Sequence, residues 1–117
     1  MAHLKDKHER GLRSKTVAIG IDPLKSLTTG IDNIAIGTSV ADALTTGICN
    51  VAIGVGAYGA ATTGCFNVGL GSSALGGSTT GINNIAIGKN TMDDLTSGAC
   101  NIALGVNALG AATSACG

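Results

Sequence analysis

The stretch TTGINNIAIG at residues 79–88 decides the fold, because close copies of it recur every 17 residues along most of this 117-residue chain. Helical-hairpin repeats need roughly 33–47 residues, so a period of 17 is too short for them. The period suits one coil of a β-solenoid, in which two short strands alternate with two turns. The sequence therefore predicts an all-β fold, a parallel β-roll of about six coils over residues 16–117 that begins with the degenerate copy TVAIG at 16–20.

The strand segment of each copy alternates large and small apolar residues. In NIAIG at 33–37, Ile34 and Ile36 share one face and Ala35 occupies the other. We expect the branched residues to stack as aliphatic ladders inside the coil. The small residues then form an outer wall against which another backbone packs closely. This predicted small-residue wall consists of Ala18, Ala35, Ala52, Gly69, Ala86 and Ala103.

Leucines in the second half of the copies offer another contact surface. Six coils spaced by about 4.8 Å make a rod of roughly 30 Å with little interior. We expect either the small-residue wall or a leucine ladder to pack against identical neighbours, because a closed oligomer leaves no free edge. The leucine ladder consists of Leu24, Leu44, Leu75, Leu95 and Leu109.

Composition excludes several classes of protein. Hydrophobic residues make up 44% and charged residues 12% of the chain, which contains 19 glycines. Low charge argues against intrinsic disorder, and the glycines lack the every-third-residue period of collagen. The chain has one tyrosine, one phenylalanine and no tryptophan, so a core built on aromatic anchors is excluded. The length fits one domain.

Charge divides the chain into two segments. Residues 1–15 contain five basic and two acidic side chains (net +3), whereas residues 16–117 contain two basic and five acidic ones (net −3). We expect 1–15 to be an arm that orders on an anionic or acidic protein surface, with a solvated terminus as the alternative. The candidate docking residues are Leu4, Lys5, Lys7, Arg10, Leu12, Arg13 and Lys15.

The asparagine that begins each strand copy has a structural explanation. Asparagine side chains stacked at coil spacing hydrogen-bond one another and cap turn amides. We therefore expect a structural ladder rather than a ligand site. The members of this Asn ladder are Asn33, Asn50, Asn67, Asn84 and Asn101.

The sequence carries no recognisable catalytic or cofactor-binding pattern. The only histidines, His3 and His8, lie in the arm, so no base accompanies the serines of the repeats. GVGAYG at 54–59 matches the dinucleotide pattern G-x-G-x-x-G but lacks a following helix pattern and an acidic residue about 20 positions on. Cysteine and histidine spacing fits no metal site. We expect a protein that is not an enzyme and has no cofactor or metal.

Nucleic-acid and membrane partners are equally unsupported. The body is acidic, and the arm lacks aromatic residues for stacking on bases. The arm also lacks the apolar run of a secretory signal. The longest apolar passage, 48–61, is broken by glycine and too short to span a bilayer. We expect synthesis in the cytoplasm without an export signal.

The four cysteines form two pairs with the same offset. Cys49 and Cys65, and likewise Cys100 and Cys116, are 16 residues apart, one fewer than the period. Neighbouring coils would bring the Cα atoms of each pair to roughly 6 Å, within the range of a disulfide. Bridges Cys49–Cys65 and Cys100–Cys116 are the intrachain pairing that fits. Four free thiols and bridges between subunits are the alternatives.

At the level of whole motifs, TTGIDNIAIG at 28–37 and TTGINNIAIG at 79–88 resemble repeats of bacteriophage tail-fibre and other virion proteins. They are also similar to the head repeats of trimeric autotransporter adhesins, whose hallmark is an N-x-A-I-G strand. The resemblance covers about residues 16–117 and implies a homotrimeric parallel β-roll.

A short arm followed by a rod is further similar to phage capsid-decoration, or cement, proteins. In these a small trimer sits on the capsid and an arm reaches between major capsid subunits. The resemblance implies a structural virion protein whose partners are itself and the major capsid protein or another virion protein. The alternative is a tail-fibre or adhesin-type head segment that binds a host surface.

Overall fold

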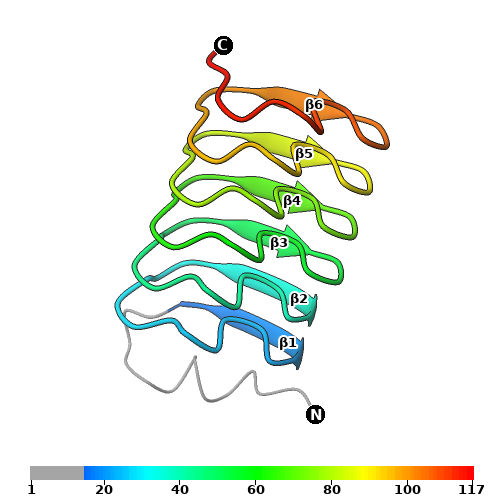
Figure 1. Cartoon of the computed structure of the whole chain (residues 1–117). Helices are drawn as coiled ribbons and strands as arrows, with labels where there is room; N and C mark the ends of the chain where they lie inside the picture. The colour runs from blue at the N-terminus through cyan, green and yellow to red at the C-terminus, as the bar shows by residue number, and fades with distance from the viewer. Residues whose placement is uncertain (1–14) are drawn as a thin grey trace.

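A computed structural model describes residues 15–117 as a parallel β-solenoid (Figure 1). Six strands form one sheet in chain order, and every pairing is parallel. The predicted all-β fold of stacked 17-residue coils is therefore confirmed. The strands are β1 (Val17–Ile21), β2 (Ile34–Thr38), β3 (Val51–Ile53), β4 (Val68–Leu70), β5 (Ile85–Ile87) and β6 (Ile102–Leu104).

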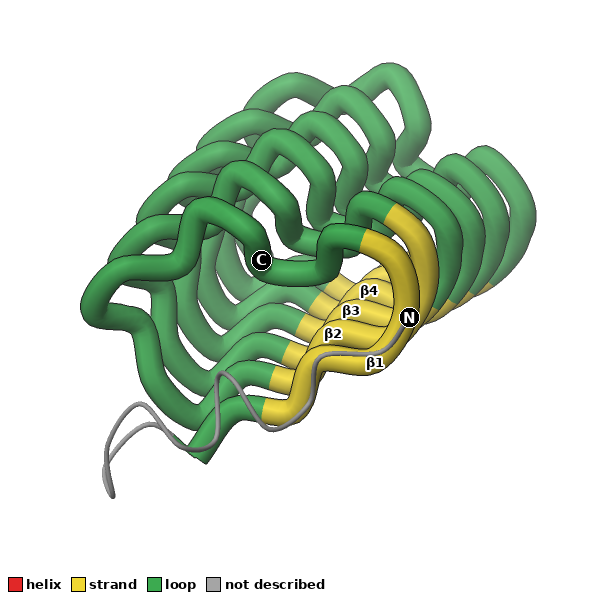
Figure 2. The backbone as a smooth tube through the Cα atoms, turned by 90° about the horizontal axis from the view of Figure 1, so that it is seen from below, coloured by secondary structure: helices red, strands yellow, loops and turns green. Residues whose placement is uncertain are grey.

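The register between coils follows the repeat without a slip. Ala35 of β2 pairs with Ala52 of β3, and the same 17-residue offset relates all other strand pairs. Seen along the stack, the strands lie along one wall of the coil and loops make up the rest (Figure 2). A second, shorter set of parallel bridges joins Cys65 to Ile82, Ile82 to Ala99, and Ala99 to Cys116.

A glycine lies three residues after the first residue of each strand because the backbone there has a conformation that side chains avoid. Gly71, for example, has a φ of 129°, in the region open mainly to glycine. A Cβ at this position would also lie 2.8 Å from the carbonyl oxygen of Gly88 in the next coil. The equivalent glycines of the other coils have φ values between 125° and 135°. Conformation and close stacking together explain this glycine column.

The interior contains the small strand residues, not the branched ones, so the predicted assignment of the two strand faces is wrong. Ala35 and Ala86 are fully buried, whereas Ile53 is 38% exposed. The physical reason is volume. Large side chains of the second half of each coil, mostly leucines and in one coil Tyr58, fill the thin interior, which leaves room for little more than a methyl group beneath the strand. All six members of the predicted small-residue wall are buried: Ala18, Ala35, Ala52, Gly69, Ala86 and Ala103.

The leucine ladder is likewise core and not a contact surface over most of its length. Leu24, Leu44, Leu75 and Leu95 are fully buried, whereas Leu109 in the last coil is 44% exposed. The expectation that either the small-residue wall or the leucine ladder packs against identical neighbours is therefore corrected. Neither set offers a continuous outer surface.

Candidate interaction surface

The outer wall of the sheet is an uncharged, apolar surface, which we call the aliphatic face. Two side chains of each strand point outward, and the strands themselves contain no charged residue. Extended apolar patches of this kind commonly mark interaction sites on soluble proteins. The aliphatic face consists of Val17, Ile19, Ile34, Ile36, Val51, Ile53, Val68, Leu70, Ile85, Ile87, Ile102 and Leu104.

Exposed apolar residues next to the positive-φ glycines widen this surface in three of the coils. Ile21 at the end of β1, Val55 and Val106 each follow such a glycine and are more than half exposed. The equivalent positions of the other coils hold Thr38, Ser72 and Lys89. At the last strand the exposure rises further, to 75% for Ile102 and 74% for Leu104, because no described coil covers them. Apolar side chains therefore face solvent from the first described coil to the last.

Inside the coil, the asparagines form the hydrogen-bonded ladder that the repeat suggests. Asn33 Oδ1 accepts hydrogen bonds from both the backbone N and the Nδ2 of Asn50, each at 3.0 Å. Asn33 Nδ2 donates to the carbonyl of Gly47 at 2.9 Å. These side chains are buried and use their polar atoms on one another and on the backbone. Their geometry supports a structural role.

A single tyrosine interrupts this ladder. The hydroxyl of Tyr58 is buried and accepts a hydrogen bond of 2.7 Å from Asn67 Nδ2. In other coils, the Nδ2 of each asparagine donates to the Oδ1 of the asparagine in the preceding coil. Asn84 Nδ2 makes no such bond to Asn67 Oδ1 in the described chain and donates to the carbonyl of Gly98. Burial raises the pKa of Tyr58, the hydrogen bond from Asn67 lowers it, and the nearby Cys65 raises it. The phenol is therefore neutral and structural.

Threonines form a polar edge between the coils. Thr45 Oγ1 donates to the carbonyl of Thr62 at 3.0 Å, and Thr62 Oγ1 donates to that of Thr79 at 3.2 Å. The residue after each of these is exposed, as at Thr46 and Thr63. This edge differs chemically from the aliphatic face, because its hydroxyl groups give it ready contact with water.

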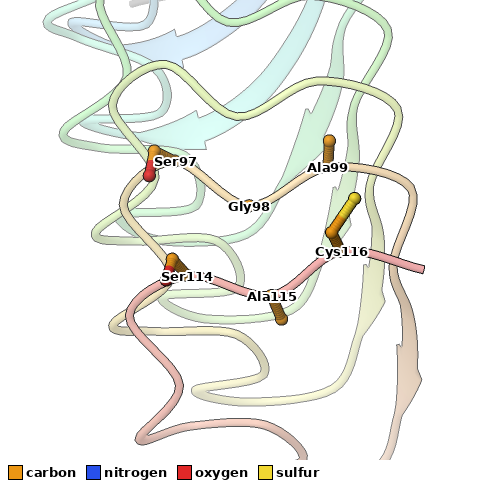
Figure 3. A pocket seen from close by; sticks show the side chains of 6 residues that line it. All are labelled: Ser97, Gly98, Ala99, Ser114, Ala115 and Cys116. Carbon is orange, nitrogen blue, oxygen red and sulfur yellow. The ribbon is translucent and has the colours of Figure 1, made fainter.

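A shallow open pocket of about 240 Å³ lies at the C-terminal end of the solenoid (Figure 3). It is lined by Ser97, Gly98, Ala99, Ser114, Ala115 and Cys116. The small side chain of Ala99 stands where the preceding coil has Ile82. The lining offers hydroxyl groups and one thiol but no acid–base pair.

Most of the predicted docking residues fall outside the described part of the chain. Leu4, Lys5, Lys7, Arg10, Leu12 and Arg13 lie there, and only Lys15 is described, as an exposed residue. Residues 15–117 contain no cluster of three or more His, Cys, Asp or Glu side chains that could hold a metal ion. Nor does this part of the chain form a helix long and apolar enough to cross a membrane.

The cysteines are free thiols in the structure. Cys49 and Cys65 are half-buried, and Cys100 and Cys116 are exposed. Cys65 Sγ donates to the carbonyl of Thr63 at 3.3 Å. The predicted disulfide pairing stays a prediction.

Sequence reasoning missed the aliphatic face, which it placed inside the coil. The substitutions in the second half of the copies could have revealed it. Tyr58 stands where Leu24 and Leu75 stand in other coils, and in the same coil Ala61 stands where Leu44 does. A large residue accompanied by a small one indicates that both share a limited interior. The large residues of the second half of the coil therefore fill that interior, and no room is left there for the isoleucines of the strand.

Comparison with protein-family models, curated proteins and solved structures returns no match for this chain.

Proposed function

We propose that this chain is a structural virion protein, a homotrimeric capsid-decoration protein whose copies associate through the aliphatic face. The observation that supports this most is the continuous, uncharged apolar wall along the sheet. Covering the exposed part of an isoleucine on this face, 38% at Ile53, contributes about 1 kcal/mol. Twelve such side chains therefore contribute about 10 kcal/mol per copy, which is set against the entropic cost of association.

Three copies around one axis satisfy the geometry of such a wall. Each solenoid turns its sheet toward the axis, so that the aliphatic faces meet and the threonine edges stay in water. A closed rotational assembly covers the apolar surface without leaving a sheet face free to bind further copies. The number three comes from the resemblance of the repeats to trimeric adhesin heads and virion proteins.

The basic arm at 1–15 is the part that docks on the particle in this proposal. Because the arm precedes the first coil in the chain, rotational symmetry puts the three points where the arms begin at the same end of the rod. Each arm pairs some of its five basic residues with acidic groups of capsid subunits, and Leu4 and Leu12 add apolar contact. Binding by one arm raises the effective concentration of the other two, so three weak contacts act as one strong attachment.

Light scattering on the purified protein tests the assembly. The wild type should have three times the chain mass of 11.3 kDa, about 34 kDa. Ile53→Lys places a charge in the aliphatic face and should give the monomer mass. Thr63→Lys places the same charge on the threonine edge of the same coil and serves as the matched control, which should remain trimeric. A wild-type monomer would contradict the proposal.

Co-sedimentation with capsids tests the docking role. Protein lacking residues 1–15 should remain trimeric and lose binding to capsids, whereas the full chain should bind. If the shortened trimer binds a host surface as well as the full chain does, the fibre or adhesin-type alternative is correct and the decoration role is wrong.

A further inference from the structure

The register of the solenoid brings the four cysteines together in two pairs on its outer surface. Ala99 pairs with Cys116 across neighbouring coils, and Cys100 directly follows Ala99. Figure 3 shows the Cys116 side chain directed toward Ala99 of the preceding coil. Cys100 and Cys116 are therefore diagonal neighbours, one coil and one residue apart.

The first pair has the same arrangement. Phe66 N donates to the carbonyl of Ile48 at 3.0 Å, just as Gly117 N donates to that of Ala99 at 3.1 Å. Cys65 precedes Phe66, and Cys49 follows Ile48. One coil spacing and one residue step place the Cα atoms of each pair about 6 Å apart, within the disulfide range of about 4.4–6.8 Å.

Other intrachain pairings are excluded by distance. Cys65 and Cys100 are separated by two coils, which is roughly 10 Å, and both Cys49–Cys100 and Cys65–Cys116 span three coils, roughly 14 Å. A disulfide cannot bridge Cα atoms more than about 7 Å apart without moving the backbone. Within the solenoid, each thiol thus has one partner within reach.

We propose that Cys49–Cys65 and Cys100–Cys116 form disulfides that clamp neighbouring coils when the protein meets an oxidising environment. All four thiols reach solvent at least in part, so a small oxidant can attack them. Cys65 gives up only its sulfur hydrogen bond to the Thr63 carbonyl. The clamps act within one chain and are independent of the proposed trimer.

The chemistry is thiol–disulfide exchange with a small-molecule disulfide such as glutathione disulfide. One cysteine thiolate attacks a sulfur of the oxidant and expels a glutathione thiolate, forming a mixed disulfide. The neighbouring cysteine thiolate then attacks the protein sulfur and expels the second glutathione. Each bridge removes two protons and two electrons from the protein, and the electrons leave in two molecules of reduced glutathione.

The second clamp has a mechanical role because of its position. It ties the coil that contains β6 to the coil before it, at the end of the sheet where β6 pairs only with β5. End strands open more easily than central ones. A bridge that closes a loop of about 15 residues should slow this opening on the order of 100-fold.

Peptide mapping tests the pairing directly, because trypsin separates the two pairs. The basic residues of the body are Lys25 and Lys89, so digestion yields peptides 26–89 and 90–117, each with one predicted pair. After oxidation with glutathione disulfide and alkylation under denaturing conditions, we expect two separate peptides. Each should carry no alkyl group and lack the two hydrogens lost to one bridge.

Every other pattern overturns the proposal. Peptides 26–89 and 90–117 joined to each other would show that cysteines pair across the two sets. Two copies of one peptide joined together would show bridges between subunits. Alkylated cysteines after oxidation would show that the thiols stay free.

Hydrogen exchange at β6 tests the clamp. Oxidised wild type should exchange its β6 amides on the order of 100-fold more slowly than Cys100→Ser under the same conditions. Cys49→Ser is the matched control, since it removes the distant bridge and should leave β6 protected. In reductant the wild type and Cys100→Ser should exchange alike. Equal exchange in oxidant would overturn the clamp.

Discussion

Replacing Asn50 by alanine tests whether the buried asparagine ladder holds the coils together. Asn50 Oδ1 accepts from the backbone N of Asn67 at 2.9 Å, and Asn50 Nδ2 donates to the carbonyl of Gly64 at 2.8 Å. Alanine removes both partners from groups that stay buried. The coil spacing is set by the backbone ladder, so the surrounding residues cannot close over the gap.

The expected cost follows from these two abandoned groups. A buried donor or acceptor without a partner costs about 1–3 kcal/mol. Two such groups and the small cavity lower the free energy of unfolding by about 4 kcal/mol. Asn101→Ala is the matched control. Its side chain also makes two donor bonds, but Asn84 Oδ1 keeps its bond from the backbone N of Asn101, and the other acceptor is the carbonyl of the half-buried Ala115. Water can reach that carbonyl, so the cost should stay near 1 kcal/mol.

Guanidinium unfolding followed by circular dichroism measures both variants against the wild type, in reductant so that disulfides play no part. We expect a clear loss of stability for Asn50→Ala and a small one for Asn101→Ala. A loss below about 1 kcal/mol for Asn50→Ala would refute the reasoning. Equal losses in the two variants would refute the role assigned to burial.

Three further variants are predicted. Ser78→Ala should raise the free energy of unfolding by about 1 kcal/mol, because the buried Ser78 Oγ has no hydrogen-bond partner; unchanged or lower stability in denaturant unfolding would contradict this. Ala52→Leu should lower the free energy of unfolding by about 1–3 kcal/mol, because leucine overpacks the interior; an unchanged thermal midpoint would mean that Ala52 faces outward. Tyr58 has an ordinary pKa of 10.0, which burial raises in the folded state. Above about pH 10 the unfolded chain therefore loses the phenol proton while the folded chain keeps it, so stability should fall by about 1.4 kcal/mol per pH unit. Tyr58→Phe should lack this decline, as unfolding curves between pH 9 and pH 11 would show; parallel curves for the two proteins would contradict it.

The fold could be predicted from the sequence because its repeat is unambiguous. Asn33 and Asn50 recur at the spacing of one coil, and a glycine that must adopt positive φ lies three residues after the start of each strand. Each of these local requirements can be recognised in a single copy of the repeat, and its recurrence in the other copies strengthens the prediction. The period, the strand positions and the asparagine ladder all follow from them.

The orientation of the strand could not be predicted by the same reasoning. Strand patterns normally separate an apolar face from a polar one. In IAI at 85–87, both faces are apolar and differ only in size. Hydrophobicity alone puts isoleucine inside, but the leucines of the opposite half-coil have already taken that volume. The choice depends on packing across the coil, which no single strand reveals.

The aliphatic face is best understood by comparing it with the threonine edge of the same coils. Within residues 50–66, Thr62 and Thr63 show that this chain uses hydroxyl residues on an outer surface. If the sheet faced water, threonine would suit position 53 as well as isoleucine does, because polar and apolar β-branched residues both favour strands. Yet all twelve positions of the aliphatic face carry Val, Ile or Leu, and Thr38 at the end of β2 lies outside this face. Two outer surfaces of opposite character, kept apart in every coil, are expected if one meets water and the other meets further copies of the chain.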